Sequence, residues 1–187
     1  MYNRAKSCII LIILFSLSLP LNSAQGEELF SRKCEGKYFT IYYQPEIDLL
    51  AMTREIDIYP SQYLIFDSQN RESNPELNLT KTLDALFLEV SDILDMHLYS
   101  FHGNIKVCRD FEELEKIFYD YYNLQLKTPS FYIYNSNTIY VDAASLNACV
   151  LGHEIAHAII CHYFVVLPPI KVQEVLAGYV EYQLKKR

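Results

Sequence analysis

Residues 153–157 read His-Glu-Ile-Ala-His, and this stretch does most to decide the fold and the chemistry expected of the 187-residue chain. Two histidines four residues apart lie one above the other on a helix face, because one turn takes about 3.6 residues. Two imidazoles placed in this way can bind one zinc ion, and the glutamate between them can act as a general base. The pentapeptide therefore predicts a helix that carries two zinc ligands, His153 and His157, and a catalytic residue, Glu154.

A catalytic zinc takes three protein ligands and leaves a fourth position open, so the third ligand has to come from outside this helix. The helix with the motif is expected over about 145–163, and the two prolines at 168–169 predict a turn after it. A last amphipathic helix over 170–186 can then fold back across the first. Glu174 lies near its beginning, and we expect it to be the third ligand.

Glu181 is the competing candidate for the third ligand, because it lies seven residues after Glu174 on the same face of the predicted helix. Glu174 is favoured by its place beside the turn. Ala177 and Gly178 are small, so we expect them to let the two helices pack closely. Cys149 lies one turn before the motif and could ligate zinc as a thiolate, but a small buried core residue is the preferred interpretation.

A longer pattern surrounds these residues. It reads Val150-Leu151-Gly152-His153-Glu154-Ile155-Ala156-His157-Ala158, followed by Pro169, Gln173-Glu174, Ala177 and Tyr179. This pattern resembles the gluzincin metallopeptidases, most closely their small peptidase MA-like or minigluzincin members. The chain departs from the family at Gln173, where Asn is frequent, and at Val175, where Gly is frequent; it also lacks the Trp often found before the ligand glutamate.

The resemblance implies a zinc metalloendopeptidase-like hydrolase with Zn²⁺ held by His153, His157 and Glu174. Glu154 would be the general base that takes a proton from a zinc-activated water and passes it to the leaving amine. The implied fold is α+β and zincin-like: a small mixed sheet with an edge strand, a backing helix, an HExxH active-site helix and a C-terminal glutamate-bearing helix. The strand over 137–141 resembles the family's edge strand, which pairs with extended peptide.

Sheet elements precede the motif helices along the chain, which favours one α+β domain. The predicted strands cover 37–43, 105–108, 130–134 and 138–142, with a hairpin turn over 135–137. One helix is expected to begin at Thr80 after a polar loop over 67–78, and a second to follow a capping box made by Asp110 and Glu113.

The composition narrows the classes of partner. Hydrophobic residues make up 51% of the chain and charged residues 21%, as in globular proteins. The net charge is −7 and no Lys/Arg cluster occurs before the last three residues, which argues against binding to nucleic acid or to an anionic membrane surface. A peptide or protein substrate is instead what the resemblance to gluzincin metallopeptidases implies. A carbohydrate-binding surface is a third idea that rests only on the 16 tyrosines, which more often line strands and clefts.

The N-terminus has the features of a targeting segment. Basic residues precede an apolar run over 8–19, which is shorter than the roughly 20 residues that cross a membrane, and small residues follow at 24–26. We predict a cleaved signal peptide over 1–26, a gluzincin-like metallopeptidase domain over 27–187, and a secreted or periplasmic location. Membrane attachment is expected only if the segment stays uncleaved.

Several points stay open at the level of sequence. Tyr179, Tyr182 and His162 lie near enough in sequence to stabilise an oxyanion, but each is more typical of a structural role. Export would permit disulfides, and only a pairing of Cys149 with Cys161 is excluded, because the two lie about 18 Å apart on one predicted helix. The leading hypothesis is an exported zinc metallopeptidase, and the alternative is a catalytically silent exported zincin-fold binding module.

Overall fold

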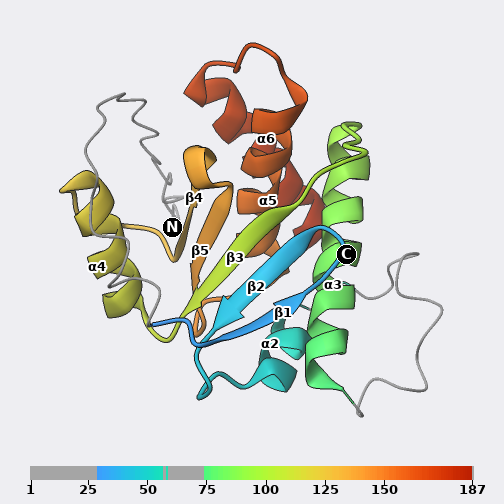
Figure 1. Ribbon diagram of the computed structural model, residues 1–187. Coiled ribbons are helices and arrows are strands. Elements are labelled where there is room, and N and C mark those ends of the chain that lie inside the picture. Colours follow the sequence, from blue (N-terminus) through green and yellow to red (C-terminus); the bar gives the residue numbers. More distant parts are fainter. Residues whose placement is uncertain (1–28, 57, 59–73, 187) are drawn as a thin grey trace, which may run out of the picture.

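A computed structural model describes residues 29–56, 58 and 74–186 of the chain (Figure 1). The strands are β1 (Arg32–Glu35), β2 (Phe39–Tyr43), β3 (Gly103–Cys108), β4 (Ser130–Ile133) and β5 (Thr138–Asp142). The helices are α2 (Leu49–Glu55), α3 (Pro75–Leu94), α4 (Phe111–Tyr122), α5 (Ala148–Tyr163) and α6 (Ile170–Lys185), with a 3-10 turn η1 (Tyr134–Ser136) between β4 and β5. Within those ranges, no helix combines the length and the apolar character that a membrane crossing requires.

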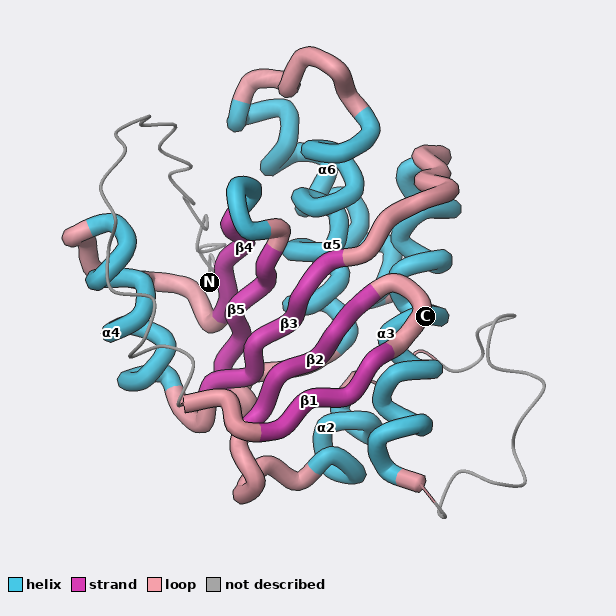
Figure 2. The backbone as a smooth tube through the Cα atoms, in the orientation of Figure 1, coloured by secondary structure: helices cyan, strands magenta, loops and turns pink. Residues whose placement is uncertain are grey.

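The five strands form one mixed sheet in the order β1-β2-β3-β5-β4 (Figure 2). The three central strands β2, β3 and β5 run parallel, and the two outer strands β1 and β4 are antiparallel to their neighbours. Ile41, Ile105, Ile139 and Tyr132 lie in register across four strands, and all four side chains are buried. This row fixes the register, because a slip of one residue would turn each side chain to the other face.

Helices cover both faces of the sheet, which gives three layers (Figures 1 and 2). Helices α2, α3 and α5 enclose the core on the face that carries the isoleucine row, and α6 packs against α5 and α3. Helix α4 covers the opposite face. Alternation along each strand supplies both cores: Val107 and Val141 contribute to the first, Cys108 and Tyr140 to the second.

Helix α5 is buried for most of its length. Asn147 precedes it, and the side-chain Oδ1 of Asn147 accepts hydrogen bonds from the backbone N–H groups of Cys149 and Val150. After the first turn, apolar residues occur on all sides of α5 and most are shielded from solvent, as expected for a helix enclosed by a sheet and other helices. The capped start therefore sets the rotation with which α5 presents its side chains to α6.

The close approach of α5 and α6 depends on Gly152. A Cβ atom built on Gly152 would lie 2.3 Å from Cδ1 of Leu184 in α6, so any larger residue would force the Leu184 side chain to move. The prediction that Gly178 provides this room is wrong, because a Cβ atom on Gly178 would meet nothing within 4 Å. Ala177, the other small residue singled out, is fully buried.

The edge strand differs from the one expected. The strand predicted over 137–141 corresponds to β5, which lies between β3 and β4, so its assignment as the edge strand is wrong. The edge is formed by β4, because the hairpin through η1 folds β4 back outside β5. The hairpin itself is confirmed, with Asn137 at its tip in the left-handed region at φ 46°.

Three other elements were placed incorrectly or missed. Helix α3 begins at Pro75 rather than Thr80, because the side chain of Asn74 caps it and proline is favoured in the first turn. Strand β1 and helix α2 were not predicted; each is short, and the strand has only one buried side chain. The capping box predicted for α4 is confirmed in part: Asp110 accepts a hydrogen bond from the backbone N–H of Glu113, but the side chain of Glu113 accepts one from the backbone N–H of Arg109 rather than from that of Asp110. The predicted signal peptide over 1–26 lies outside the described residues.

Candidate metal centre

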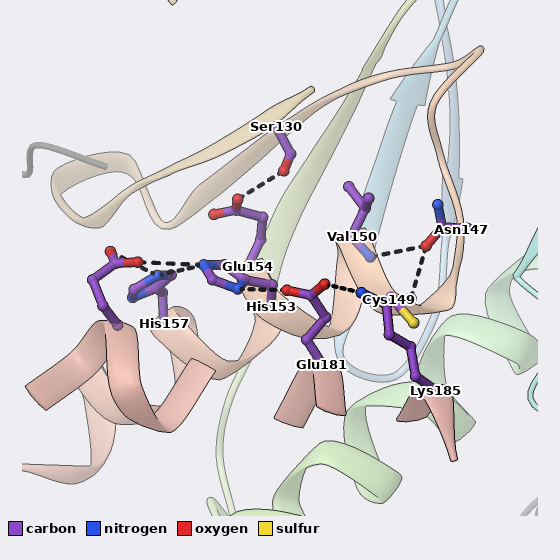
Figure 3. Close-up of polar contacts among 10 residues, drawn as sticks. Ser130, Asn147, Cys149, Val150, His153, Glu154, His157, Glu181 and Lys185 are labelled. Atoms are coloured by element: carbon purple, nitrogen blue, oxygen red, sulfur yellow. Dashed lines mark hydrogen bonds and ion pairs between the residues drawn. The ribbon is translucent and has the colours of Figure 1, made fainter. Parts of the chain in front are cut away.

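Three side chains from two helices converge at the junction of α5 and α6. Nitrogen and oxygen atoms of His153, His157 and Glu174 all lie within 4.8 Å of one another. The Nε2 atoms of the two histidines are 3.3 Å apart. Carboxylate oxygens of Glu174 lie 3.4 Å from Nε2 of His157 and 3.7 Å from Nε2 of His153. Both ring nitrogens that face each other therefore also face the carboxylate of Glu174. Figure 3 shows the rings of His153 and His157 side by side.

The spacing of these atoms fits a small divalent cation. Two atoms bound to one tetrahedral ion at about 2.0–2.1 Å, the bond length for Zn²⁺, are separated by about 3.3 Å. The separations within the cluster are equal to this value or exceed it by a few tenths of an ångström. In addition, Oε1 of Glu174 is buried without a hydrogen-bond partner, and burying a carboxylate oxygen in that state is costly. A cation among the three side chains would satisfy it.

The electrostatics of the cluster also suit a cation. Burial, together with the neighbouring charge of His153, lowers the pKa of His157 to about 4, so its imidazole is neutral at pH 7. A metal-binding histidine has to be neutral. Burial alone would lower the pKa of His153, but its contact with Glu174 and the charges of nearby glutamates outweigh burial and raise it. The cluster thus combines a neutral imidazole at His157 with carboxylates that favour positive charge at His153, and a metal cation suits both.

Glu154 lies beside the cluster, and its carboxylate is not one of the three groups that converge there. Its side chain is almost completely buried, with the residue 1% exposed, and Ser130 Oγ donates a hydrogen bond of 2.7 Å to Oε1. The other oxygen, Oε2, has no hydrogen-bond partner. Burial raises the pKa of Glu154 to about 6, although the positive charge of His153 and the hydrogen bond from Ser130 oppose this effect. Glu154 can therefore accept a proton near neutral pH.

Two further residues belong to the surroundings of the site, and the sequence alone did not reveal their contacts: Ser130, which contacts Glu154, and Glu181, which contacts His153. Ser130 was noted only as part of a strand; the alternation that directs Tyr132 toward α5 also directs Ser130 there, and this was the available signal. Glu181 was weighed as a third ligand, but its Oε2 lies 3.7 Å from Nδ1 of His153, the ring nitrogen that faces away from the cluster. Figure 3 shows Glu181 between His153 and Lys185.

The remaining candidates have other surroundings. Tyr179 and Tyr182 are about half exposed on α6, and the ammonium group of Lys186 lies over the ring of Tyr182. His162 contacts the backbone oxygen of Ala158 through Nδ1 and packs edge-on against an aromatic ring. Cys149 is only partly buried and lies outside the cluster, so the expectation that it is a fully buried core residue is wrong. All four cysteines of the described residues are free thiols.

Comparisons of the chain with family models, with curated proteins and with solved structures find no match. The likeness to gluzincins therefore depends on the HExxH stretch and on the helix that carries Glu174. The geometry by itself gives a metal-sized cluster of His153, His157 and Glu174, and beside it a buried carboxylate that is not a ligand.

Proposed function

We propose that this chain is an exported zinc-dependent metallopeptidase of the gluzincin type. The observation that carries the proposal is the convergence of His153, His157 and Glu174 on one metal-sized gap, with the carboxylate of Glu154 left free beside it. Two imidazoles and one carboxylate are a frequent ligand set of catalytic zinc, and they leave the fourth position open. The same donors on one helix hairpin are uncommon in a purely structural site, where four ligands usually enclose the ion.

The roles of the protein groups follow from their surroundings. A zinc ion bound here would supply Lewis acidity to a substrate carbonyl and lower the pKa of a water molecule. Glu154 would take the proton of the attacking water and deliver it to the amine that leaves. Ser130 would hold one oxygen of that carboxylate, so that the unpartnered Oε2 is the oxygen that exchanges the proton.

Strand β4 offers a place for an extended substrate. It pairs with β5 on one side, and among the strands in the described part of the chain none pairs with its other side. Ser130 at the beginning of β4 contacts Glu154, so this free edge runs past the base. A peptide that adds to β4 as a further strand would receive main-chain hydrogen bonds and lie next to the cluster. The proposal therefore assigns pairing with an extended peptide to β4, whereas the sequence resemblance assigned it to the strand over 137–141.

The test combines metal content with turnover. Purified protein should contain about one equivalent of zinc, and it should cleave members of a quenched fluorescent peptide library. A chelator should abolish cleavage, and restored zinc should return it. Glu154→Gln should keep the zinc and lower kcat/KM by a factor of about 10²–10⁴, as expected when a general base is lost. Glu112→Gln on α4 removes the same charge at an exposed position and should cleave as fast as the wild type.

A catalytically silent exported binding module is the second candidate. The observation that favours it is the burial of Glu154, which is only 1% exposed and so has little direct access to solvent. This candidate predicts bound zinc without cleavage of any library member. If Glu154→Gln cleaves peptides as fast as the wild type, the proposed mechanism is wrong. Zinc that does not bind at all would exclude the metallopeptidase and leave the binding module, which can keep the fold without the metal.

A further inference from the structure

The two histidines of the cluster differ in what faces their second ring nitrogen. Nδ1 of His153 lies 3.7 Å from Oε2 of Glu181, which is one turn before the end of α6. Nδ1 of His157 is buried and has no hydrogen-bond partner. Glu181 in turn forms an ion pair with Lys185, one turn further along the same helix. A chain of contacts therefore runs from Lys185 through Glu181 to His153 (Figure 3).

We propose that Glu181 is a positioning residue for the metal centre, and that it orients His153 as a ligand without binding the metal itself. The proposal rests on the proposed zinc site. Glu181 lies outside the set of atoms that approach one another within 4.8 Å. Its carboxylate faces Nδ1, whereas Nε2 of His153 faces Glu174. Glu174 and Glu181 thus face different nitrogens of the His153 ring, so they do not compete for the same place in the metal centre.

The chemistry of imidazole gives this placement a consequence. A neutral imidazole carries one N–H group and one nitrogen lone pair, and a hydrogen bond to one nitrogen decides which tautomer is present. A carboxylate beside Nδ1 favours the tautomer with hydrogen on Nδ1, which leaves the lone pair of Nε2 directed at the cluster. Histidines that ligate metals commonly have such an outer partner, and loss of the partner weakens metal affinity by about 10–100-fold.

Lys185 contributes by holding the carboxylate. Its Nζ binds Oε1 of Glu181, which leaves Oε2 for the ring of His153. The side chain of His153 is 13% exposed, that of Glu181 37% and that of Lys185 62%. The contacts thus run outward from a mostly buried ligand to a solvent-exposed cation, so the ion pair of Glu181 and Lys185 itself contributes little to folding stability.

The test measures metal affinity rather than turnover. The full chain is prepared as wild type, Glu181→Ala, Glu181→Gln and the control Glu112→Ala, and each competes with a chromophoric chelator for zinc. Glu181→Ala should bind zinc about 10–100-fold more weakly than the wild type. Glu181→Gln should recover part of this loss, because its amide oxygen keeps a hydrogen-bond acceptor next to Nδ1. Glu112→Ala should equal the wild type.

Cobalt spectra and melting curves separate positioning from folding. The visible bands of Co²⁺-loaded Glu181→Ala should differ from those of the wild type, while the metal-free proteins should unfold within about 2 °C of each other. If the alanine variant fails to fold, Glu181→Gln alone decides, and its affinity should then fall below that of the wild type. Wild-type affinity in both Glu181 variants would overturn the proposal and leave the zinc site standing. A wild type without zinc would overturn the proposed function.

Discussion

The contact between Gly152 and Leu184 allows a sharp prediction, because the chain contains a matched control. Gly152→Ala places a Cβ atom 2.3 Å from Cδ1 of Leu184, whereas carbon atoms in contact prefer about 3.5–4.0 Å. The deficit of more than 1 Å has to be relieved by rotation of Leu184 or by separation of the helices. Overpacking of this kind costs about 1–3 kcal/mol, and the flexible end of the leucine places the cost near the lower limit.

Gly178→Ala isolates the opposing effect. Gly178 also lies within a helix, and a Cβ atom there meets nothing within 4 Å. Alanine should therefore stabilise α6 by about 0.5–1 kcal/mol through its helix propensity alone. The same propensity gain applies to Gly152→Ala, so the difference between the two variants measures the overpacking. We expect Gly178→Ala to be the more stable variant by about 1 kcal/mol.

Urea unfolding of the two metal-free proteins, followed by circular dichroism, gives this difference directly. The double variant Gly152→Ala/Leu184→Ala supplies the second measurement. Removal of the leucine side chain should relieve the clash, so the two substitutions should show a coupling energy of about 0.5–3 kcal/mol. Equal stability of Gly152→Ala and Gly178→Ala would refute the reasoning, because it would mean that α5 and α6 are not in close contact at Gly152.

Three further predictions address the metal, the base and the thiols. Zinc at 1,000 times its Kd should stabilise the protein by about 4 kcal/mol, which raises the Tm of a domain of this size by roughly 8–16 °C. Differential scanning fluorimetry measures this rise in Tm, and His157→Ala should abolish it. Ser130→Ala should lower the unfolding free energy by about 1–3 kcal/mol, because it leaves a buried carboxylate oxygen unpaired, yet zinc affinity in the chelator assay should not change. Burial raises the pKa values of the Cys34 and Cys161 thiols to about 11, so about one in a thousand is ionised at pH 8. A thiol-specific dye should label the partly buried Cys149 first. The labelling rates of Cys34 and Cys161 should rise about tenfold per pH unit, because only the thiolate reacts. Labelling of all four cysteines at one rate would contradict the prediction.

Much of the fold was accessible from the sequence because the signals were local. The cap and capping box before α4, the hairpin around Asn137 and the apolar spacing of α3 are each decided by neighbouring residues. Helix α5 was expected over about 145–163 and spans Ala148–Tyr163; the difference at its start arises because Asn147, rather than Ser145, provides the cap. Local side-chain hydrogen bonds of this kind can be predicted from residue types at a fixed spacing in the sequence.

The errors arose where contacts between segments far apart in the sequence determine the strand order or the packing of helices. Nothing local shows that β4 rather than β5 lies at the sheet edge, since both strands are fully buried and rich in β-formers. Gly152 and Gly178 are both helix glycines, and only the crossing with Leu184 distinguishes them. Likewise, the position of Glu181 relative to His153 depends on how α6 is rotated against α5. The convergence of His153, His157 and Glu174 could be anticipated because a single turn joins their helices.

That single turn also bears on the order of events during folding. All three candidate ligands lie within the α5–α6 hairpin, and the outermost two, His153 and Glu174, are 21 residues apart in the chain. Closing this loop costs less conformational entropy than pairing the parallel strands β2, β3 and β5, because each of those pairings closes a longer loop. A metal ion could thus be captured while the sheet is still incomplete. Glu154 meets Ser130 only once β4 is in place, so metal capture and alignment of the base would be separate steps during folding.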